Sequence, residues 1–236
     1  MNLITKNLIN NFSIILSLCF FYFLIFNASV LFLGKKFKII KKRRFLSNQE
    51  VFLLGGYFIF IPIILLILYS SNLLIINSTE NFILIFSLFF IFLFGIIDDN
   101  IDLKPLIKTL SSCTIFLFFL YFSKGIRISE LNLYFIYYSF LPLESFLFTV
   151  LCLYILQNSI NFSDGINGVA IIIILSINLI LLFYNQNQNL LFLLIFIINL
   201  LFFLLILNLR DKIFLGDAGV NLLSFLTAIN IITIFN

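Results

Sequence analysis

Long apolar runs, separated by short polar segments, make up most of this chain. A transmembrane helix needs about 20 apolar residues, and the runs are close to that length. The pattern predicts an all-α, polytopic membrane helical bundle of about eight transmembrane helices. The predicted spans are Phe12–Leu33, Val51–Tyr69, Phe82–Ile97, Leu106–Phe122, Phe140–Leu156, Ile166–Tyr184, Leu190–Leu207 and Val220–Phe235.

Six aspartates lie in or near three of the polar segments, at 98–102, 161–165 and 216–219. A carboxylate beside hydrocarbon is energetically costly and is seldom there without a function. If the three segments meet on one membrane face, they suggest a site for a cation and a phosphorylated substrate. The aspartates are Asp98, Asp99, Asp102, Asp164, Asp211 and Asp217.

The basic residues predict the orientation of the bundle. With eight spans, eleven of the fourteen Lys and Arg residues fall on one face, which marks that face as cytoplasmic and places both termini outside. All six aspartates fall on the same face, although the topology does not depend on them. Seven of the basic residues lie within 35–44, where anionic lipid headgroups attract them. One of these, Arg43 or Arg44, is available to face a substrate phosphate.

Composition narrows the possible chemistry. The chain has 236 residues, 63% hydrophobic and 10% charged, whereas soluble domains are about 25% charged. We therefore expect one integral-membrane domain, 1–236, with a retained first span rather than a cleaved signal peptide. The three cysteines show no metal-type spacing, and the chain has no histidine. Catalysis must then rest on carboxylates, lysines, arginines and amides.

Asp98 and Asp99 close the third predicted span, and Lys108 opens the fourth. Adjacent carboxylates repel each other unless they share a cation or a proton. Mg²⁺ meets that need, because it binds a few carboxylates together with substrate oxygens, and Lys108 could reach an anionic substrate. Taken alone, the aspartate pair is better explained as a solvated helix end and Lys108 as a membrane anchor.

Two further segments combine amides, carboxylates and glycines. Asn158, Asn161 and Asp164 are spaced by three, which places them on nearly one helical face, suited to a ribose, a base edge or a metal-bound phosphate. Ordinary capping at a helix end is the weaker alternative. Asp217 stands between glycines before the last span, where a helix N-terminus offers amides to a phosphate. An N-cap role for Asp217 is equally favoured by this motif alone.

Together the motifs resemble the polyprenyl-phosphate N-acetylhexosamine-1-phosphate transferase superfamily, glycosyltransferase family 4. Its members include undecaprenyl-phosphate GlcNAc-1-phosphate and phospho-MurNAc-pentapeptide transferases. Four ordered motifs covering nearly the whole chain are more specific than any one of them. They are the basic loop with Gly55-Gly56, Phe94-Gly95-Ile96-Ile97-Asp98-Asp99 with Leu103 and Lys108, Asn158/Asn161/Asp164-Gly165 with Asn167-Gly168-Val169-Ala170, and Ile213-Phe214-Leu215-Gly216-Asp217-Ala218-Gly219.

The resemblance implies a reaction and its partners. Undecaprenyl phosphate, or another polyprenyl phosphate, would take N-acetylhexosamine-1-phosphate from a UDP-sugar and release UMP, as the first membrane step of cell-envelope polysaccharide synthesis. The cofactor implied is Mg²⁺, with Mn²⁺ as a substitute. The location implied is a bacterial inner membrane, with the active site on the cytoplasmic face. The lipid bilayer and a homodimer are expected partners, and nucleic acid is not.

The resemblance also assigns residues to roles. The metal ligands would be Asp217 and Asp98, and the catalytic residues Asp98, Asp99 and Lys108. The substrate-binding residues would be Asn158, Asn161, Asp164, Phe214 and Arg44, with Phe214 stacked on the uracil.

The chain departs from the family pattern at three places. Ser47 stands where a histidine usually follows the basic pair, and Val220 where a serine usually follows GDxG. The family's further C-terminal spans and His-rich loop are expected to be missing, so an inactive or partner-dependent membrane paralogue remains the alternative function. A CDP-alcohol phosphotransferase would need an Ala-Arg pair after Asp164-Gly165, which is not there. A transporter would place its acids near mid-membrane, whereas the acids of this chain lie at the ends of the predicted spans.

Overall fold

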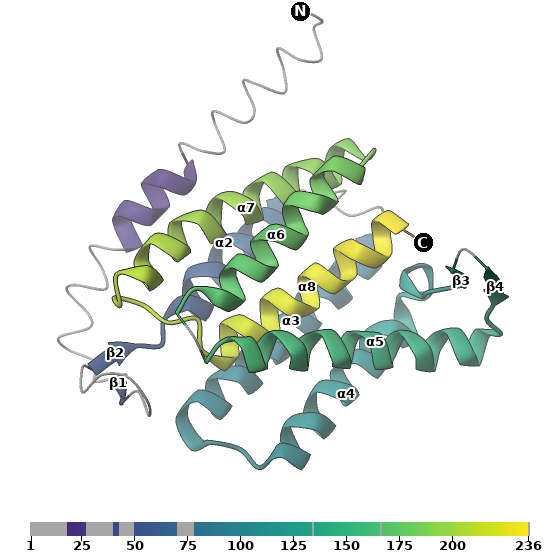
Figure 1. Cartoon of the computed structure of the whole chain (residues 1–236), viewed down its shortest axis with the longest axis horizontal. Coiled ribbons are helices and arrows are strands. Elements are labelled where there is room, and N and C mark those ends of the chain that lie inside the picture. Colours follow the sequence, from purple (N-terminus) through teal and green to yellow (C-terminus); the bar gives the residue numbers. More distant parts are fainter. Residues whose placement is uncertain are drawn as a thin grey trace, which may run out of the picture.

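The computed structural model of the chain describes residues 18–26, 40–42, 50–69, 78–133, 135–165 and 167–235. Helices dominate these residues (Figure 1), as the apolar runs predict. The helices are 18–26, α2 (Gly55–Tyr69), α3 (Ser78–Ile101), α4 (Pro105–Phe122), the 3₁₀ turn η1 (Lys124–Ile126), α5 (Pro142–Ser163), α6 (Val169–Tyr184), α7 (Gln188–Leu209) and α8 (Gly216–Phe235). The strands are β1 (Ile40–Lys42), β2 (Glu50–Phe52), β3 (Glu130–Leu133) and β4 (Ile136–Ser139).

The helices confirm a polytopic all-α membrane protein. In the described part of the chain, five helices are long and apolar enough to cross a bilayer, namely α3, α4, α5, α7 and α8. Two shorter apolar helices, Gly55–Leu68 and Val169–Tyr184, lie beside them. The first predicted span is described only at 18–26, where it is helical.

Several helices extend beyond the predicted apolar spans into the polar segments. Helix α3 continues to Ile101 rather than ending at Ile97, and α5 continues to Ser163 rather than Leu156. Helix α8 begins at Gly216, four residues before its apolar run. Hydropathy marks where the apolar side chains end, whereas backbone hydrogen bonding carries a helix further. The polar motifs therefore belong to rigid helix ends.

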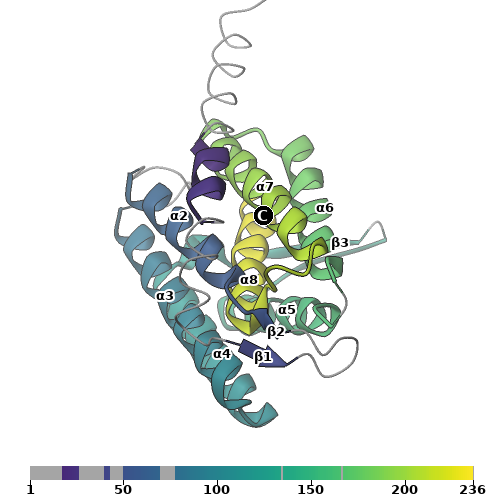
Figure 2. The ribbon, with the colours of Figure 1, turned by 90° about the vertical axis from the view of Figure 1, so that its left-hand side faces the viewer.

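Helix α8 runs through the centre of the bundle and packs against α2, α3, α5 and α6 (Figures 1 and 2). Of its best apolar window, 72% is buried, the largest share among the candidate spans of the described residues. Phe225 of α8 packs against two rings of α4, stacked on Phe116 at a centroid distance of 5.4 Å and edge-on to Phe119 at 5.2 Å. The central helix thus places its first turn, with Asp217, inside the bundle.

Glycine lets α3 and α2 approach α8 closely at this first turn. A Cβ atom added to Gly95 of α3 would lie 2.3 Å from Ala218 Cα, and one added to Gly56 of α2 would lie 2.9 Å from Gly219 N. The amides of Gly55 and Gly56 also donate to the carbonyls before α8. Small residues permit such contact between membrane helices, and here they fix where α8 begins.

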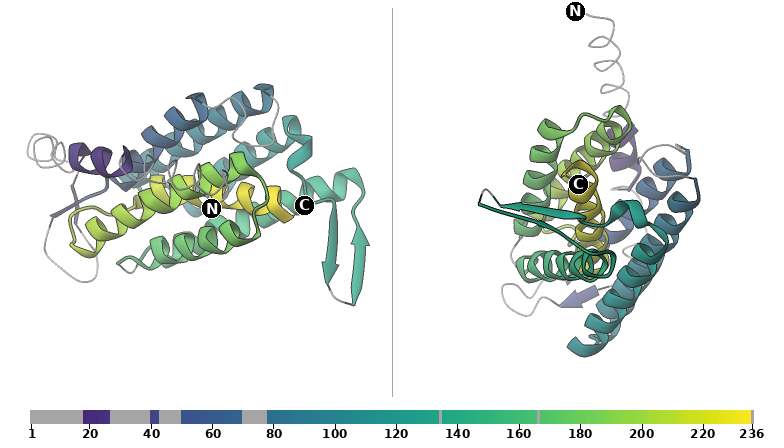
Figure 3. Two further views of the ribbon diagram at one scale, coloured as in Figure 1. Left: turned by 90° about the horizontal axis from the view of Figure 1, so that it is seen from above. Right: turned by 90° about the vertical axis from the view of Figure 1, so that its right-hand side faces the viewer.

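The β3–β4 hairpin projects beyond the helices at the end of the bundle opposite the turn between α3 and α4 (Figure 3). Its strands are antiparallel, with Leu131 opposite Tyr138. Tyr137 donates its hydroxyl to Glu130 at 2.7 Å, and this hydrogen bond raises the pKa of the phenol. Exposed tyrosines are typical of a membrane interface, so the hairpin suits the bilayer boundary remote from the aspartates.

Candidate active site at the ends of four helices

The ends of three helices bring two carboxylates and one ammonium group together. Asp98 lies in the last turn of α3, Lys108 in the first turn of α4, and Asp217 in the first turn of α8. Lys108 Nζ lies 2.6 Å from Asp98 Oδ2 and 3.6 Å from Asp217 Oδ2. The Asp98 side chain is 4% exposed and that of Lys108 39%, so the contact lies at the edge of the bundle with one end open.

The second oxygen of each carboxylate accepts a hydrogen bond from a neutral group. Asp98 Oδ1 accepts from the backbone amide of Leu103 at 2.9 Å. Asp217 Oδ1 accepts from Asn161 Nδ2 of α5, also at 2.9 Å. A fourth helix therefore contributes to the site. Asp98, Lys108, Asn161 and Asp217 are called the charged centre below.

Asp99 points to the start of α8 and caps it. Its Oδ1 accepts from the Asp217 amide at 2.8 Å and its Oδ2 from the Ala218 amide at 3.2 Å. The positive end of the helix dipole favours an anion there. Gly216 has φ +70°, and a Cβ on it would lie 2.8 Å from Asp99 Oδ2, so glycine is needed at that position. These two amides, for which the sequence left a phosphate and capping by Asp217 as equal alternatives, are bonded to Asp99.

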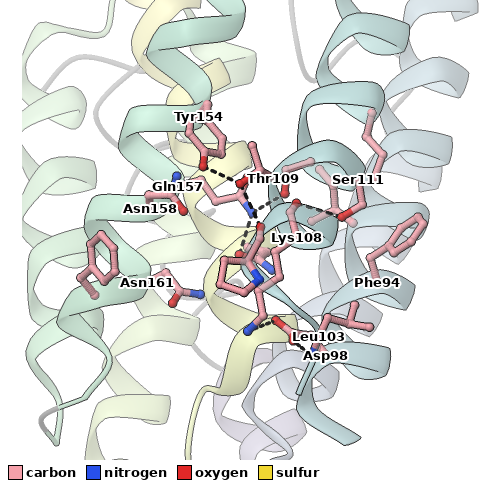
Figure 4. Close-up of a pocket in the computed structure, with 16 residues that line it drawn as sticks. Phe94, Asp98, Leu103, Lys108, Thr109, Ser111, Tyr154, Gln157, Asn158 and Asn161 are labelled. Carbon is pink, nitrogen blue, oxygen red and sulfur yellow. Dashed lines mark hydrogen bonds and ion pairs between the residues drawn. The ribbon is translucent and has the colours of Figure 1, made fainter. Parts of the chain in front are cut away.

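A pocket of about 330 Å³ opens beside the charged centre, between α3, α4, α5 and α8. Apolar side chains, including Ile91, Phe94 and Ile115, form part of its wall. Figure 4 shows Asp98 and Lys108 at one end and uncharged polar side chains at the other. The pocket can therefore hold a ligand that is charged at one end and uncharged at the other.

The uncharged end of the pocket was not predicted from the sequence. Tyr154 and Thr109 share a hydrogen bond of 2.8 Å between their hydroxyls. Gln157 Nε2 donates to Ser112 Oγ at 3.0 Å and to Asn221 Oδ1 at 2.7 Å. The signal available in the sequence was the position of these polar residues within apolar helices: Thr109 directly follows Lys108, and the others lie four residues from a predicted site residue.

The remaining predicted residues have different surroundings. Asn158 is half-buried and lines the pocket. Asp164 caps the end of α5 and is not among the residues that line it. Phe214 is 8% exposed, with its carbonyl bonded to the amide of Gly55, and also lies outside the lining. Arg44 falls outside the described residues.

The donor atoms of the charged centre fit a divalent cation that binds few protein ligands. Within the described residues there is no group of three or more His, Cys, Asp or Glu side chains that could hold a metal. Asp98 and Asp217 nevertheless converge on one point, now facing Lys108 Nζ. Mg²⁺ is commonly held by one or two carboxylates plus substrate phosphate oxygens, so this pair suits Mg²⁺ better than a fully protein-ligated ion.

Comparison with known proteins connects this geometry to a family. The family model described as Glycosyl transferase family 4 matches residues 81–235, about two thirds of the chain. The matched segment begins in α3 and ends in α8, so it contains the whole charged centre and the pocket. A search among curated proteins found no match.

Proposed function

The chain belongs to glycosyl transferase family 4, a family of polyprenyl-phosphate sugar-1-phosphate transferases, and on this basis we propose its reaction. It transfers N-acetylhexosamine-1-phosphate from a UDP-sugar to polyprenyl phosphate, such as undecaprenyl phosphate, and releases UMP. The observation that supports this is the convergence of Asp98, Lys108, Asn161 and Asp217 beside a pocket. The site would face the cytoplasm of a bacterial cell, where nucleotide sugars are available.

The reaction is a phosphoryl transfer between two anions. An oxygen of the lipid phosphate forms a bond to the β-phosphorus of the UDP-sugar. The bond from that phosphorus to the oxygen bridging the two phosphates breaks, and the oxygen leaves on UMP with the electron pair. The protein's work in such a reaction is mainly positioning and charge stabilisation.

The residues of the charged centre would position the reactants and stabilise their charge. Lys108, held by Asp98 and partly exposed, presents a cation to the anionic reactants and lowers their mutual repulsion. Asn161 orients Asp217 through its amide. Asp98 and Asp217 would hold Mg²⁺, which when bound neutralises charge on a diphosphate. Asp99 keeps the first turn of α8, and with it Asp217, in place.

The proposed substrate contacts follow from position in the fold and from family membership. Asn158 lines the pocket one turn before Asn161 on α5, so the two amides can contact the same nucleotide. Asp164 and Phe214 would join the nucleotide site only if their surroundings rearranged on binding. Arg44 is proposed to contact a substrate phosphate from the basic segment.

The direct test is turnover by the purified full-length chain. The protein in detergent is incubated with labelled UDP-GlcNAc, undecaprenyl phosphate and Mg²⁺, with UDP-GalNAc as a second donor. UMP and labelled lipid are expected together in equal amounts. If a UDP-HexNAc binds but UMP never forms, the proposed reaction is wrong and the inactive or partner-dependent paralogue is the better account.

A further inference from the structure

Gln157 joins three helices in the wall of the pocket, and the roles proposed above do not include it. Its side chain is 6% exposed. Its amide nitrogen donates to Ser112 of α4 and to Asn221 of α8, across 45 and 64 residues of sequence. A buried amide nitrogen without acceptors is costly, so the two bonds of Nε2 favour one arrangement of α4, α5 and α8, while Oε1 has no partner among the described residues. Gln157, Ser112 and Asn221 are called the Gln157 node below.

Each member of the node lies one helical turn from a member of the charged centre on the same helix. The pairs are Ser112 with Lys108 on α4, Gln157 with Asn161 on α5, and Asn221 with Asp217 on α8. Residues four apart share a helical face, and a rise of 1.5 Å per residue separates them by about 6 Å. The node therefore repeats the convergence of the same three helices one turn further into the bundle.

The contacts within the charged centre hold these helices only loosely. Lys108 is 39% exposed, so water weakens its ion pairs, and its long stem can follow a displaced partner. The link between Asn161 and Asp217 is one hydrogen bond. In phosphoryl transfer an error of about 1 Å in placement can lower the rate on the order of 100-fold. A second, buried contact between the same helices would prevent such an error.

We propose, on the basis of the function above, that Gln157 is a positioning residue for that reaction. It fixes the rotation and axial offset of α4, α5 and α8, so that the helix ends carrying Lys108, Asn161 and Asp217 keep their relative positions while substrates bind and leave. Gln157 acts through these residues, so its loss should reduce kcat more than substrate affinity.

The bundle contains a matched control contact. Asn178 of α6 is fully buried, and its Nδ2 donates to Thr227 Oγ1 of α8 at 3.2 Å. Thr227 lies ten residues after Asp217, about 15 Å along the helix. Replacing Asn178 therefore removes the same kind of contact to the same helix without touching the charged centre.

The test compares Gln157→Leu with Asn178→Leu in the full-length chain. Thermal unfolding in detergent should show a lower midpoint in both variants, because both lose an interhelical hydrogen bond. UMP release from UDP-GlcNAc should show a kcat lower on the order of 10- to 100-fold in Gln157→Leu alone, with KM little changed. Asn221→Leu added to Gln157→Leu should lower kcat little further, since both act through one contact.

Hydrogen–deuterium exchange tests the positioning role without turnover. The amides of Asp217 and Ala218 should exchange faster in Gln157→Leu and at the wild-type rate in Asn178→Leu. If the wild type releases no UMP, the proposed function fails, and the exchange comparison alone decides whether Gln157 positions α8.

Should Gln157→Leu fail to fold, Ser112→Ala removes one of the two bonds and should lower kcat at constant KM. Two results would overturn the inference. One is that Gln157→Leu and Asn178→Leu lose kcat, and protection of the Asp217 and Ala218 amides from exchange, to the same extent. The other is that kcat is unchanged in the Gln157 and Ser112 variants.

Discussion

Asp98 and Asp99 are neighbours in the sequence but face different partners. Asp98 pairs with Lys108 beside the pocket, whereas Asp99 binds the amides of Asp217 and Ala218. Consecutive residues on a helix point about 100° apart, so both side chains of such a pair seldom serve one site. The sequence indicated that these carboxylates lie near Asp217. It could not indicate that Asp99 caps α8, because that contact spans 118 residues.

Substitutions at Asp99 should separate capping from direct chemistry. Asp99→Asn keeps one acceptor oxygen for the α8 amides, whereas Asp99→Leu removes both. Loss of a helix N-cap costs about 0.5–2 kcal/mol. The midpoint of thermal unfolding in detergent should therefore be highest in the wild type, lower in Asp99→Asn and lowest in Asp99→Leu. UMP release should follow the same order, with partial activity in Asp99→Asn. If Asp99→Asn were as inactive as Asp99→Leu while remaining stably folded, Asp99 would be acting on substrate or metal.

At the scale of the helices, the main feature is the close approach of α2 and α3 to α8. The apolar runs predicted where the helices lie, although α3, α5 and α8 extend several residues beyond those runs. They gave no sign that α8 is the central helix, because α3 and α7 are more apolar than α8, and only packing buries 72% of its best window. Gly95 and Gly56 were visible in the sequence as small residues, but their partner was not.

Gly95→Ala should displace α3 from α8. The added Cβ would lie 2.3 Å from Ala218 Cα, a backbone atom that cannot rotate away. Overpacking of this kind typically costs about 1–3 kcal/mol, so both the thermal midpoint and UMP release should fall. Gly125→Ala is the matched control, because a Cβ added there would meet nothing within 4 Å beyond its chain neighbours, and its stability should change by less than about 0.5 kcal/mol. Equal stability of the two alanine variants would contradict the packing described here.

At the scale of the whole molecule, the charged centre and the β3–β4 hairpin occupy opposite ends of the bundle. The two ends are joined by α4 and α5, each long enough to cross a bilayer. The basic residues predict that the end with the aspartates is cytoplasmic, and the hairpin would then lie outside. This orientation stays a prediction, which rests on loop charge alone. The pocket, in contrast, depends on side chains from four helices that no local pattern relates.

Reporter fusions test the orientation. A reporter fused after Asn100 or Asp211 should indicate the cytoplasm, and one after Gln188 the outside, because α6 and α7 lie between Asp164 and Asp211 as a helical hairpin. Fusions after Arg44 and at Asn236 should indicate the cytoplasm and the outside respectively. An outward signal after Asn100 would separate the charged centre from cytoplasmic nucleotide sugars and would contradict the proposed function.

The proposed function requires the reaction site to lie at the first turn of α8. The most direct measurement is UMP release by Asp217→Asn and by the wild type across a Mg²⁺ titration, with thermal unfolding as the control for folding. Asparagine preserves the shape of the side chain and removes its charge, so the variant should fold and should release no UMP at any Mg²⁺ concentration. Near-normal UMP release by Asp217→Asn, with the wild-type dependence on Mg²⁺, would contradict the account and reduce Asp217 to a structural part of α8.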